Sequence, residues 1–467
     1  MPPRLEKITL NGASRHQLHK GFILLDERWA LVDTAMSRLV IQEAQKKIEK
    51  QGLTGWMIEP SPEKPSSEHP AILHLVTPFL PVSTPEQRDQ MIKSLALATA
   101  YIVQVSEQRN CRLIAAGVNP YQEDGDEGPH ALCADLHQIE VYDAGESERI
   151  YNFFRYSLAE LLALSTHSAV YGSVVQNDCS LRMRENQMSF LPHYITEFSE
   201  QHLDQLQNMV RRVYGLQNLH QMDIDPLAGE SLEHPPPLLD KKAAAIELRF
   251  VDAQCSYAFI RAQMILFQAI AIRAREKARW GGRVYYLRDS VIDQNKALAI
   301  QNGLSAIFKP DPNVKRKEGR RLSSYHERGE VETATTALLT FIKRELLHAL
   351  RSLSCKPREI MPILLGLELR QDNRRCFANY AEYQQYLCHT YKEDFNDVLY
   401  EQSKQLLMTP SLDMISYYNQ NLYQDLTHRI EQRWEYDLRS HNHQARGQHT
   451  VRPASHDHHR GPQERKR

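Results

Sequence analysis

Short stretches with strand-like alternation come between longer stretches with helical spacing, and this order limits the fold more than any other feature. The segments expected to be strands are residues 22–33, 72–77, 112–116, 134–142 and 245–251. The segments expected to be helices between them are residues 34–51, 84–108, 147–164 and 257–279. They are not joined by the glycine-rich turns of a doubly wound fold. The pattern therefore predicts an α+β protein with a mainly antiparallel sheet flanked by helices.

The last third of the chain has a different pattern. From residue 331 to about residue 438 the apolar side chains keep helical spacing, so a helical C-terminal region is expected. From Ser440 onward there are six lysines and arginines, six histidines and almost no apolar side chains. Such a segment cannot bury enough surface to fold, so a disordered basic tail is expected, with metal or polyanion binding as the alternative. The expected division is residues 1–330, 331–438 and 439–467.

Composition excludes several classes of protein. The chain has 467 residues, 25% of them charged, a formal net charge of −1 and no apolar run long enough to span a membrane. The N-terminus lacks the apolar segment of a secretion signal, and seven scattered cysteines suit reduced thiols, so a cytoplasmic protein is expected. The basic segment Lys315 to Arg321 has no interleaved aromatic residues, which favours a solvated loop over a specific nucleic-acid site.

Glu247 and Arg249 are the first candidates for chemistry. Residues two apart on a strand share one face, so these two side chains should lie side by side while Ile246 and Leu248 face a core. A carboxylate beside a guanidinium suits a site where Glu247 binds Mg²⁺ and Arg249 contacts phosphate oxygens. A salt bridge on a solvated sheet face is the alternative, and spacing alone favours it.

Small and hydroxyl-bearing residues follow the helix that ends near Leu164. The segment Leu164 to Gly172, with Ser180 and Arg182 after it, could form a turn that lines a substrate site, with Arg182 on a phosphate. The end of a helix is also an ordinary place for such residues. These residues alone therefore do not decide between the two readings.

Five segments of the chain carry a recognisable order of motifs. In chain order they are Gly117–Tyr121, Leu164–Val170, Ser180–Arg182, Ile246–Asp252 and Asn295–Leu304. Together they resemble, over roughly residues 20–350, the glutamate–cysteine ligase type 2 family of carboxylate–amine ligases. The corresponding family motifs are a Gly-Thr-His-Pro-Phe turn, a Leu-Ser-x-x-Ser-Pro-Phe segment, a Ser-x-Arg segment, an Ile-Glu-Val-Arg-x-x-Asp strand and an Asn-Arg-x-x-Ala-x-x-x-Gly-Leu helix.

The resemblance implies a glutamine-synthetase-like catalytic fold and an ATP-dependent ligase. Such enzymes phosphorylate a carboxylate, often the γ-carboxylate of glutamate, and an amine then displaces phosphate from the acyl phosphate. The implied cofactors are ATP and Mg²⁺, with Mn²⁺ as an alternative ion, and the implied partners are small carboxylates and amines. A homodimer is left open. The implied site residues are Arg182 and Arg249 for catalysis, the same two with Asn295 for the nucleotide, and Asp26, His74 and Glu247 for the metal.

The chain departs from the family pattern at positions where the family has charged or metal-binding side chains. Arg28 stands where the first strand of the family has a glutamate, and His74 stands where the second strand has another carboxylate. The family's His-x-His strand keeps a single histidine here, His137. In the Asp-Ile-Arg-Pro turn the arginine has become Asp225. Replacing a metal carboxylate by arginine reverses the local charge. Two hypotheses remain: a ligase with an altered site, or a non-catalytic relative that binds or regulates another protein.

Overall fold

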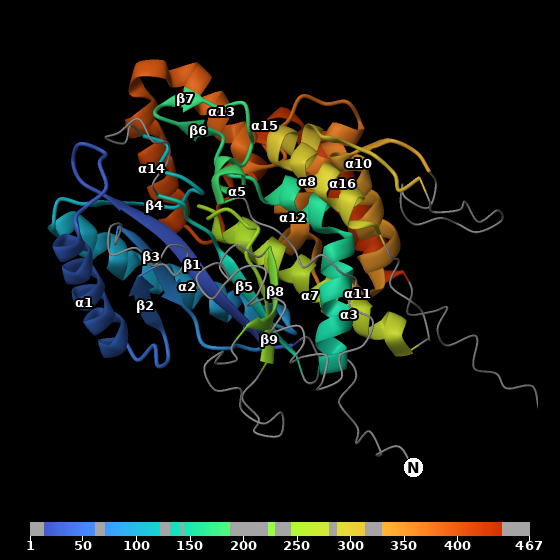
Figure 1. Cartoon of the computed structure of the whole chain (residues 1–467), viewed down its shortest axis with the longest axis horizontal. Coiled ribbons are helices and arrows are strands. Elements are labelled where there is room, and N and C mark those ends of the chain that lie inside the picture. The colour runs from blue at the N-terminus through green and yellow to red at the C-terminus, as the bar shows by residue number, and fades with distance from the viewer. Residues whose placement is uncertain are drawn as a thin grey trace, which may run out of the picture.

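The structure is a computed structural model that describes residues 14–60, 71–121, 131–141, 144–186, 223–228, 244–279, 287–312 and 329–440. Residues 441–467 of the expected tail and the whole basic segment Lys315 to Arg321 lie outside these residues. Figure 1 shows the sheet and the early helices at the lower left, with the C-terminal helices above and beside them. No helix in the described part of the chain is both long enough and apolar enough to cross a membrane.

A seven-stranded antiparallel sheet forms one layer of the molecule. Its strands run in the order β2-β3-β1-β5-β9-β8, and β4 pairs with β1. Each described pairing in this sheet is antiparallel, which confirms the predicted α+β class. The strands of the sheet are β1 (His16–Leu25), β2 (Met57–Pro60), β3 (Ile72–Val76), β4 (Arg112–Ile114), β5 (Leu136–Val141), β8 (Ile224–Ala228) and β9 (Ala244–Leu248).

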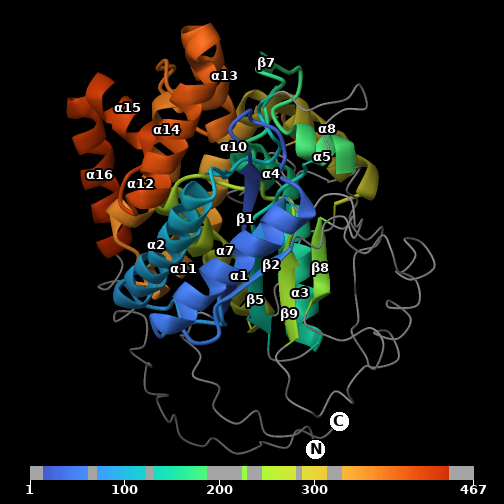
Figure 2. The ribbon, with the colours of Figure 1, turned by 90° about the vertical axis from the view of Figure 1, so that its left-hand side faces the viewer.

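The helices of the first two thirds surround this sheet (Figure 2). They are α1 (Thr34–Lys50), α2 (Pro85–Gln108), α3 (Ala144–Tyr156), α4 (Leu158–Ser165), α5 (Leu181–Asn186), α7 (Tyr257–Arg279) and α8 (Asp289–Asn302). Short strand pairs lie beyond the sheet: β6 (Val170–Tyr171) with β7 (Val174–Val175), and β10 (Ile307–Phe308) with β11 (Glu332–Thr333). The sequence Thr84-Pro-Glu-Gln87 is typical of a capping box, and at the start of α2 the side chains of Thr84 and Gln87 do bond to each other's backbone.

The C-terminal region is helical, as predicted. Its helices are α10 (Ala334–Phe341), a π-helical segment (Ile342–Leu346), α11 (Leu347–Ser352), α12 (Pro357–Gln371), α13 (Tyr380–Tyr391), α14 (Phe395–Met408), α15 (Met414–Leu422) and α16 (Gln424–Arg439). One hydrophobic cluster includes both Leu24 of the sheet and Leu364 of α12. A buried ion pair also joins the two parts, because Arg88 of α2 donates to both carboxylate oxygens of Glu359 in α12, at 2.9 and 2.8 Å.

The two faces of the sheet differ in polarity. One face packs against α7, where the Phe267 and His137 rings lie 5.0 Å apart and the Gln268 amide hydrogen-bonds with His16 Nδ1 at 3.2 Å. The strand period of two places a second set of side chains on the opposite face. This polar face carries Gln17, His19, His74, Gln138 and Glu247.

Several predicted element ends differ from the structure, for example the strand expected at residues 245–251, which ends at Leu248, and two of the differences are large. The first strand was expected at residues 22–33 but spans His16–Leu25, because the Asp26 carboxylate accepts the backbone N–H groups of Arg28 and Ala30 and turns the chain there. Trp29 in this turn has a left-handed φ of 68°. The helix expected at residues 147–164 is two helices, α3 and α4, which meet at Ser157.

Candidate functional site

A row of polar side chains crosses four strands of the polar face. Gln17 of β1 lies opposite Gln138 of β5, Gln138 lies opposite Glu247 of β9, and Glu247 lies opposite Asp225 of β8. Side chains that face each other across an antiparallel pair are about 5 Å apart at Cβ, so they can interact directly. The row therefore gathers polar groups from distant parts of the sequence.

Glu247 is the centre of this row. Gln138 Nε2 donates to Glu247 Oε2 at 2.5 Å, and Arg249 Nε donates to Glu247 Oε1 at 2.5 Å. Arg249 also reaches Asp225, with Nη2 2.9 Å from Oδ2. Glu247 is 4% exposed and Arg249 is 9% exposed. The two side chains thus lie side by side, as their spacing predicts, and the sheet face on which they lie is largely covered rather than solvated.

The ionisation of Glu247 follows from these contacts. Burial alone would raise the pKa of its carboxyl group, but the charge of Arg249, the nearby His19 and the hydrogen bonds from Gln138 and Arg249 lower that pKa to about 2. Glu247 is therefore a carboxylate at neutral pH, and Arg249 compensates its charge.

His19 and His74 lie on the same face, on neighbouring strands. Their ring centroids are 6.3 Å apart. Among the described residues, neither ring nitrogen of the fully buried His74 has a hydrogen-bond partner, and neither does Nε2 of His19. Burial lowers the pKa of both rings, that of His74 to about 3, so both imidazoles are neutral at pH 7.

The structure does not bring Asp26 to Glu247. Gln17 of β1 marks the row of Glu247, and nine residues of extended chain separate it from Asp26, which is about 30 Å at 3.3 Å per residue. The Asp26 carboxylate instead holds the turn after β1, and Arg28 in that turn is exposed. No group of three His, Cys, Asp or Glu side chains among the described residues is arranged to hold a metal ion. The set Asp26, His74 and Glu247 is thus not assembled, because the strand begins six residues earlier than expected.

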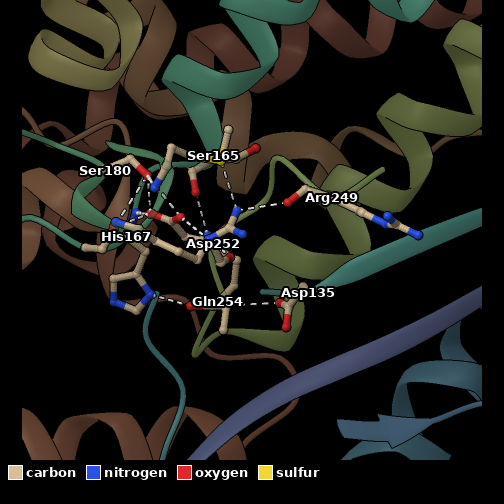
Figure 3. A network of polar contacts seen from close by, with 11 residues as sticks. Asp135, Ser165, His167, Ser180, Arg249, Asp252 and Gln254 are labelled. Atoms are coloured by element: carbon tan, nitrogen blue, oxygen red, sulfur yellow. Dashed lines mark hydrogen bonds and ion pairs between the residues drawn. The ribbon is translucent and has the colours of Figure 1, made fainter. Parts of the chain in front are cut away.

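Arg182 lies in a buried network around Asp252, shown in Figure 3. Arg182 Nε is 2.8 Å from Asp252 Oδ1, and Arg182 Nη2 donates to the backbone oxygen of Arg249 at 2.9 Å. Asp252 also accepts bonds from Ser168 Oγ at 2.7 Å and Ser180 Oγ at 3.0 Å. The side chain of Arg249 points away from this network in Figure 3. Arg182 therefore fixes the backbone beneath Arg249, and its guanidinium is directed at a carboxylate rather than at the polar face.

The segment from Leu164 to Gly172, which was expected to line a substrate turn, contributes to this same network around Asp252. The backbone N–H of His167 donates to Asp252 Oδ2 at 2.7 Å, and Ser165 Oγ bonds within its own helix to Leu161. Gly117 lies so close that an added Cβ would be 2.7 Å from Asp252 Cγ. The serine-rich segment and the Gly117 turn thus surround one buried carboxylate.

The side chain of Asn295 is bonded to the backbone of Lys309. Its side-chain Nδ2 donates to the Lys309 backbone oxygen, and its Oδ1 accepts the Lys309 backbone N–H, both at 2.9 Å. These bonds tie α8 to the chain after β10. The next residue, Lys296, forms a buried ion pair with Asp223, with Nζ 2.5 Å from Oδ2.

The structure also identifies site residues that the sequence left out or left open. The reduced His-x-His strand presents Gln138 to the polar face, while His137 points to α7 and bonds His16 with their ring nitrogens 3.0 Å apart. Gln17 and His19 were missed because the first strand was expected to start at residue 22. Burial alternates along this part of β1, but the buried positions include His16 and Lys20, so the sequence His-Gln-Leu-His-Lys carries no polar–apolar alternation that could reveal them.

Acid is expected to destabilise this protein from the pH range of histidine titration downward. Burial lowers the pKa of five histidines, to about 3 for His16 and His74, to about 4 for His167, and in direction for His19 and His137. The folded chain holds these rings neutral, whereas the unfolded chain protonates them near pH 6.5, so stability falls as the pH falls below about 6.5. Each ring contributes up to about 1.4 kcal/mol per pH unit. Urea unfolding between about pH 7.5 and pH 5 measures this slope, and a constant free energy of unfolding over that range would contradict it.

Comparison with known proteins places the fold. No protein-family model matches the chain, and no curated protein matches its sequence. Among solved structures it is similar to glutamate–cysteine ligase from Francisella tularensis in complex with AMP, with a TM-score of 0.56 and 11% identity over 92% of this chain and 98% of that one. It is also similar to a bifunctional glutathione synthetase from Pasteurella multocida, with a TM-score of 0.51 and 13% identity over 85% of this chain and 53% of that one. The chain therefore has the fold of glutamate–cysteine ligase, as its five sequence segments predicted.

Proposed function

We propose that this chain is an ATP-dependent carboxylate–amine ligase whose reaction takes place on the polar face of the sheet. The γ-carboxylate of glutamate is the proposed acceptor of phosphate, and an amine or amino acid is the proposed second substrate. The observation that carries the proposal is the buried pair of Glu247 and Arg249 on a sheet face of this fold. A guanidinium in a low-dielectric site stabilises the charge that develops on a phosphoryl group in transfer.

The roles follow from the contacts. Arg249 is the proposed catalytic residue, because its guanidinium lies on the polar face, whereas the guanidinium of Arg182 is directed at Asp252. Glu247 and Asp225 orient the Arg249 guanidinium from two sides. Arg182 is a positioning residue, which acts through Asp252 and the backbone of Arg249. Asn295 acts at a distance through the Lys309 backbone.

A carboxylate-lined Mg²⁺ site does not fit the described residues. Mg²⁺ prefers an octahedron of oxygen ligands, and Glu247 already accepts bonds from Gln138 and Arg249. In ligases of this kind a divalent ion neutralises the phosphates of ATP when it is bound. The roles proposed for Arg249 and Glu247 are argued from their own contacts, and they place no ion on these two side chains.

Turnover tests the proposal directly. The full chain is incubated with ATP, a divalent ion and a pool of carboxylates that includes glutamate, together with a pool of amines. We expect ADP and phosphate in amounts equal to the new amide, because the acyl phosphate takes the γ-phosphoryl group and the amine releases it. Absence of ADP across the whole pool, with each of Mg²⁺, Mn²⁺ and Zn²⁺, would contradict ligase activity.

A non-catalytic binding or regulatory role is the second candidate. It is favoured by a specific observation: the described residues offer no three-donor metal group, and the side chains of Arg182 and Arg249 are both held in ion pairs. Such a protein would keep the fold and bind a partner without nucleotide chemistry. Binding of ATP separates the two roles, since only the ligase needs it.

A further inference from the structure

A small pocket lies between α13 and α14, next to the network around Asp252. It contains about 230 Å³ of space free of atoms, counted out to its open mouth. Gln384 of α13 and Ser403 of α14 line it together with His167, whose backbone N–H donates to Asp252. None of the described residues that line it is an acid, a lysine or an arginine. The pocket is therefore polar without being charged.

Gln384 brings an unused hydrogen-bond donor to this pocket. Its side chain is 1% exposed, and its Oε1 accepts the backbone N–H of Ala169 at 3.2 Å. Because a backbone N–H can only donate, this bond fixes which end of the amide is oxygen. Within the described part of the chain, Nε2 of Gln384 is buried and has no hydrogen-bond partner. Buried polar groups without partners are costly and rare in native structures, so this one indicates a ligand in the pocket.

His167 offers an acceptor to the same pocket. Its Nδ1 lies 2.7 Å from the backbone oxygen of Ala253, so the proton of the ring is on Nδ1. Burial lowers the pKa of this imidazole to about 4, and the ring is neutral at pH 7. The lone pair is then on Nε2, the nitrogen that is turned away from Gln254 in Figure 3. The pocket thus combines an amide donor with an imidazole acceptor.

We propose that this pocket binds a small uncharged molecule that carries a primary carboxamide. The carbonyl oxygen of the ligand accepts from Gln384 Nε2, and its NH₂ group donates to His167 Nε2. A carboxylate has no donor for the imidazole, and a buried charge without a charged partner is unfavourable. Drug-sized ligands occupy pockets of about 300 to 1,000 Å³, so this pocket suits a smaller molecule.

Acetamide is the probe, and acetate and acetone are its matched comparisons. Each has four non-hydrogen atoms, but only acetamide is uncharged and has both a donor and an acceptor. The full chain with ¹⁵N-labelled glutamine is titrated with each compound, and the side-chain NH₂ signal of Gln384 is followed by NMR. This signal is assigned by its loss in Gln384→Met.

We expect a saturable shift with acetamide and a Kd near about 1 mM, which lies within the affinity limit for so small a ligand. Acetate and acetone are expected to bind about tenfold more weakly or less, because each leaves the imidazole acceptor unpaired. An equal response to all three compounds, or no saturable shift with acetamide, would overturn the proposal and leave the pocket to water only.

A variant then locates the ligand. Gln384→Met keeps a side chain of similar length but removes the donor, and we expect it to weaken acetamide binding about tenfold or more. Gln385→Met is the matched control, because Gln385 is the next residue of α13, is half-buried and does not line the pocket. The methyl signal of acetamide measures binding to both variants, and circular dichroism confirms their folding. Equal acetamide affinity in the two variants would overturn the proposal.

The inference is independent of the proposed ligase activity. The comparison of acetamide, acetate and acetone uses the unaltered chain without ATP or a divalent ion. It therefore decides the amide site even if Gln384→Met does not fold, and even if no turnover is found.

Discussion

Replacing Glu247 and Arg249 together by glutamine is expected to reduce ATP-dependent amide formation by about 100- to 1,000-fold while the chain stays folded. Loss of one preorganised charge-stabilising donor costs about that much in other active sites. The double variant removes one charge of each sign, so the net charge of the site is unchanged, and Asp225, which is 17% exposed, loses only its Arg249 contact. Glutamine keeps the approximate length of Glu247 and one oxygen that can accept the bond from Gln138, so the strand pairing of β9 is expected to persist.

The control is a second ion pair treated in the same way. Arg109 and Glu43 pair between α1 and α2 at 2.5 Å, with their side chains 40% and 33% exposed. Replacing both by glutamine removes the same charges away from the sheet, and we expect full activity. Steady-state rates with ATP and the best amine found in the pool measure both variants. Wild-type rates in the Glu247 and Arg249 double variant would remove these residues from the mechanism.

Replacing Asp252 by alanine is expected to destabilise the fold by about 3 to 5 kcal/mol, the usual effect of removing one partner of a buried ion pair. The side chain of Asp252 is 1% exposed and that of Arg182 is 0% exposed, so the variant would leave the Arg182 guanidinium buried without its carboxylate. Ser168 and Ser180 would lose their common acceptor as well.

Urea unfolding of the full chain measures this loss. Asp178→Ala is the matched control, because Asp178 pairs with Arg184, whose side chain is 47% exposed, and exposed pairs contribute about 1 kcal/mol or less. A second variant, Arg182→Met with Asp252→Ala, removes both charges and is expected to recover part of the lost stability. If Asp252→Ala behaves like the Asp178 control, Asp252 does not hold the site together.

The sequence predicts well where local rules decide the structure. The period of two along a strand places Glu247 and Arg249 together, and a capping box sets the start of α2. The interleaved pattern also predicts the antiparallel sheet and the helical C-terminal region, since both depend on periodicity within single segments.

The sequence predicts poorly where distant segments meet. Arg182 pairs with Asp252, which lies 70 positions further along the chain, and no local sequence pattern predicts that pair. The end of β1 is set by the turn at Asp26, and a prediction from strand propensity alone extends the strand beyond that turn. The position of β1 along the chain decides which of its residues lie on the polar face. Because β1 spans His16–Leu25, Gln17 and His19 lie there, whereas Asp26 and Arg28 come after the strand has ended.

Calorimetric titration with ATP tests the central claim most directly. We expect one ATP site per chain that requires a divalent ion and is lost in the Glu247 and Arg249 double glutamine variant. The same titration with the ion chelated gives the reference. Absence of ATP binding with Mg²⁺, Mn²⁺ or Zn²⁺ present would contradict a nucleotide-dependent ligase on this sheet and would favour the binding role.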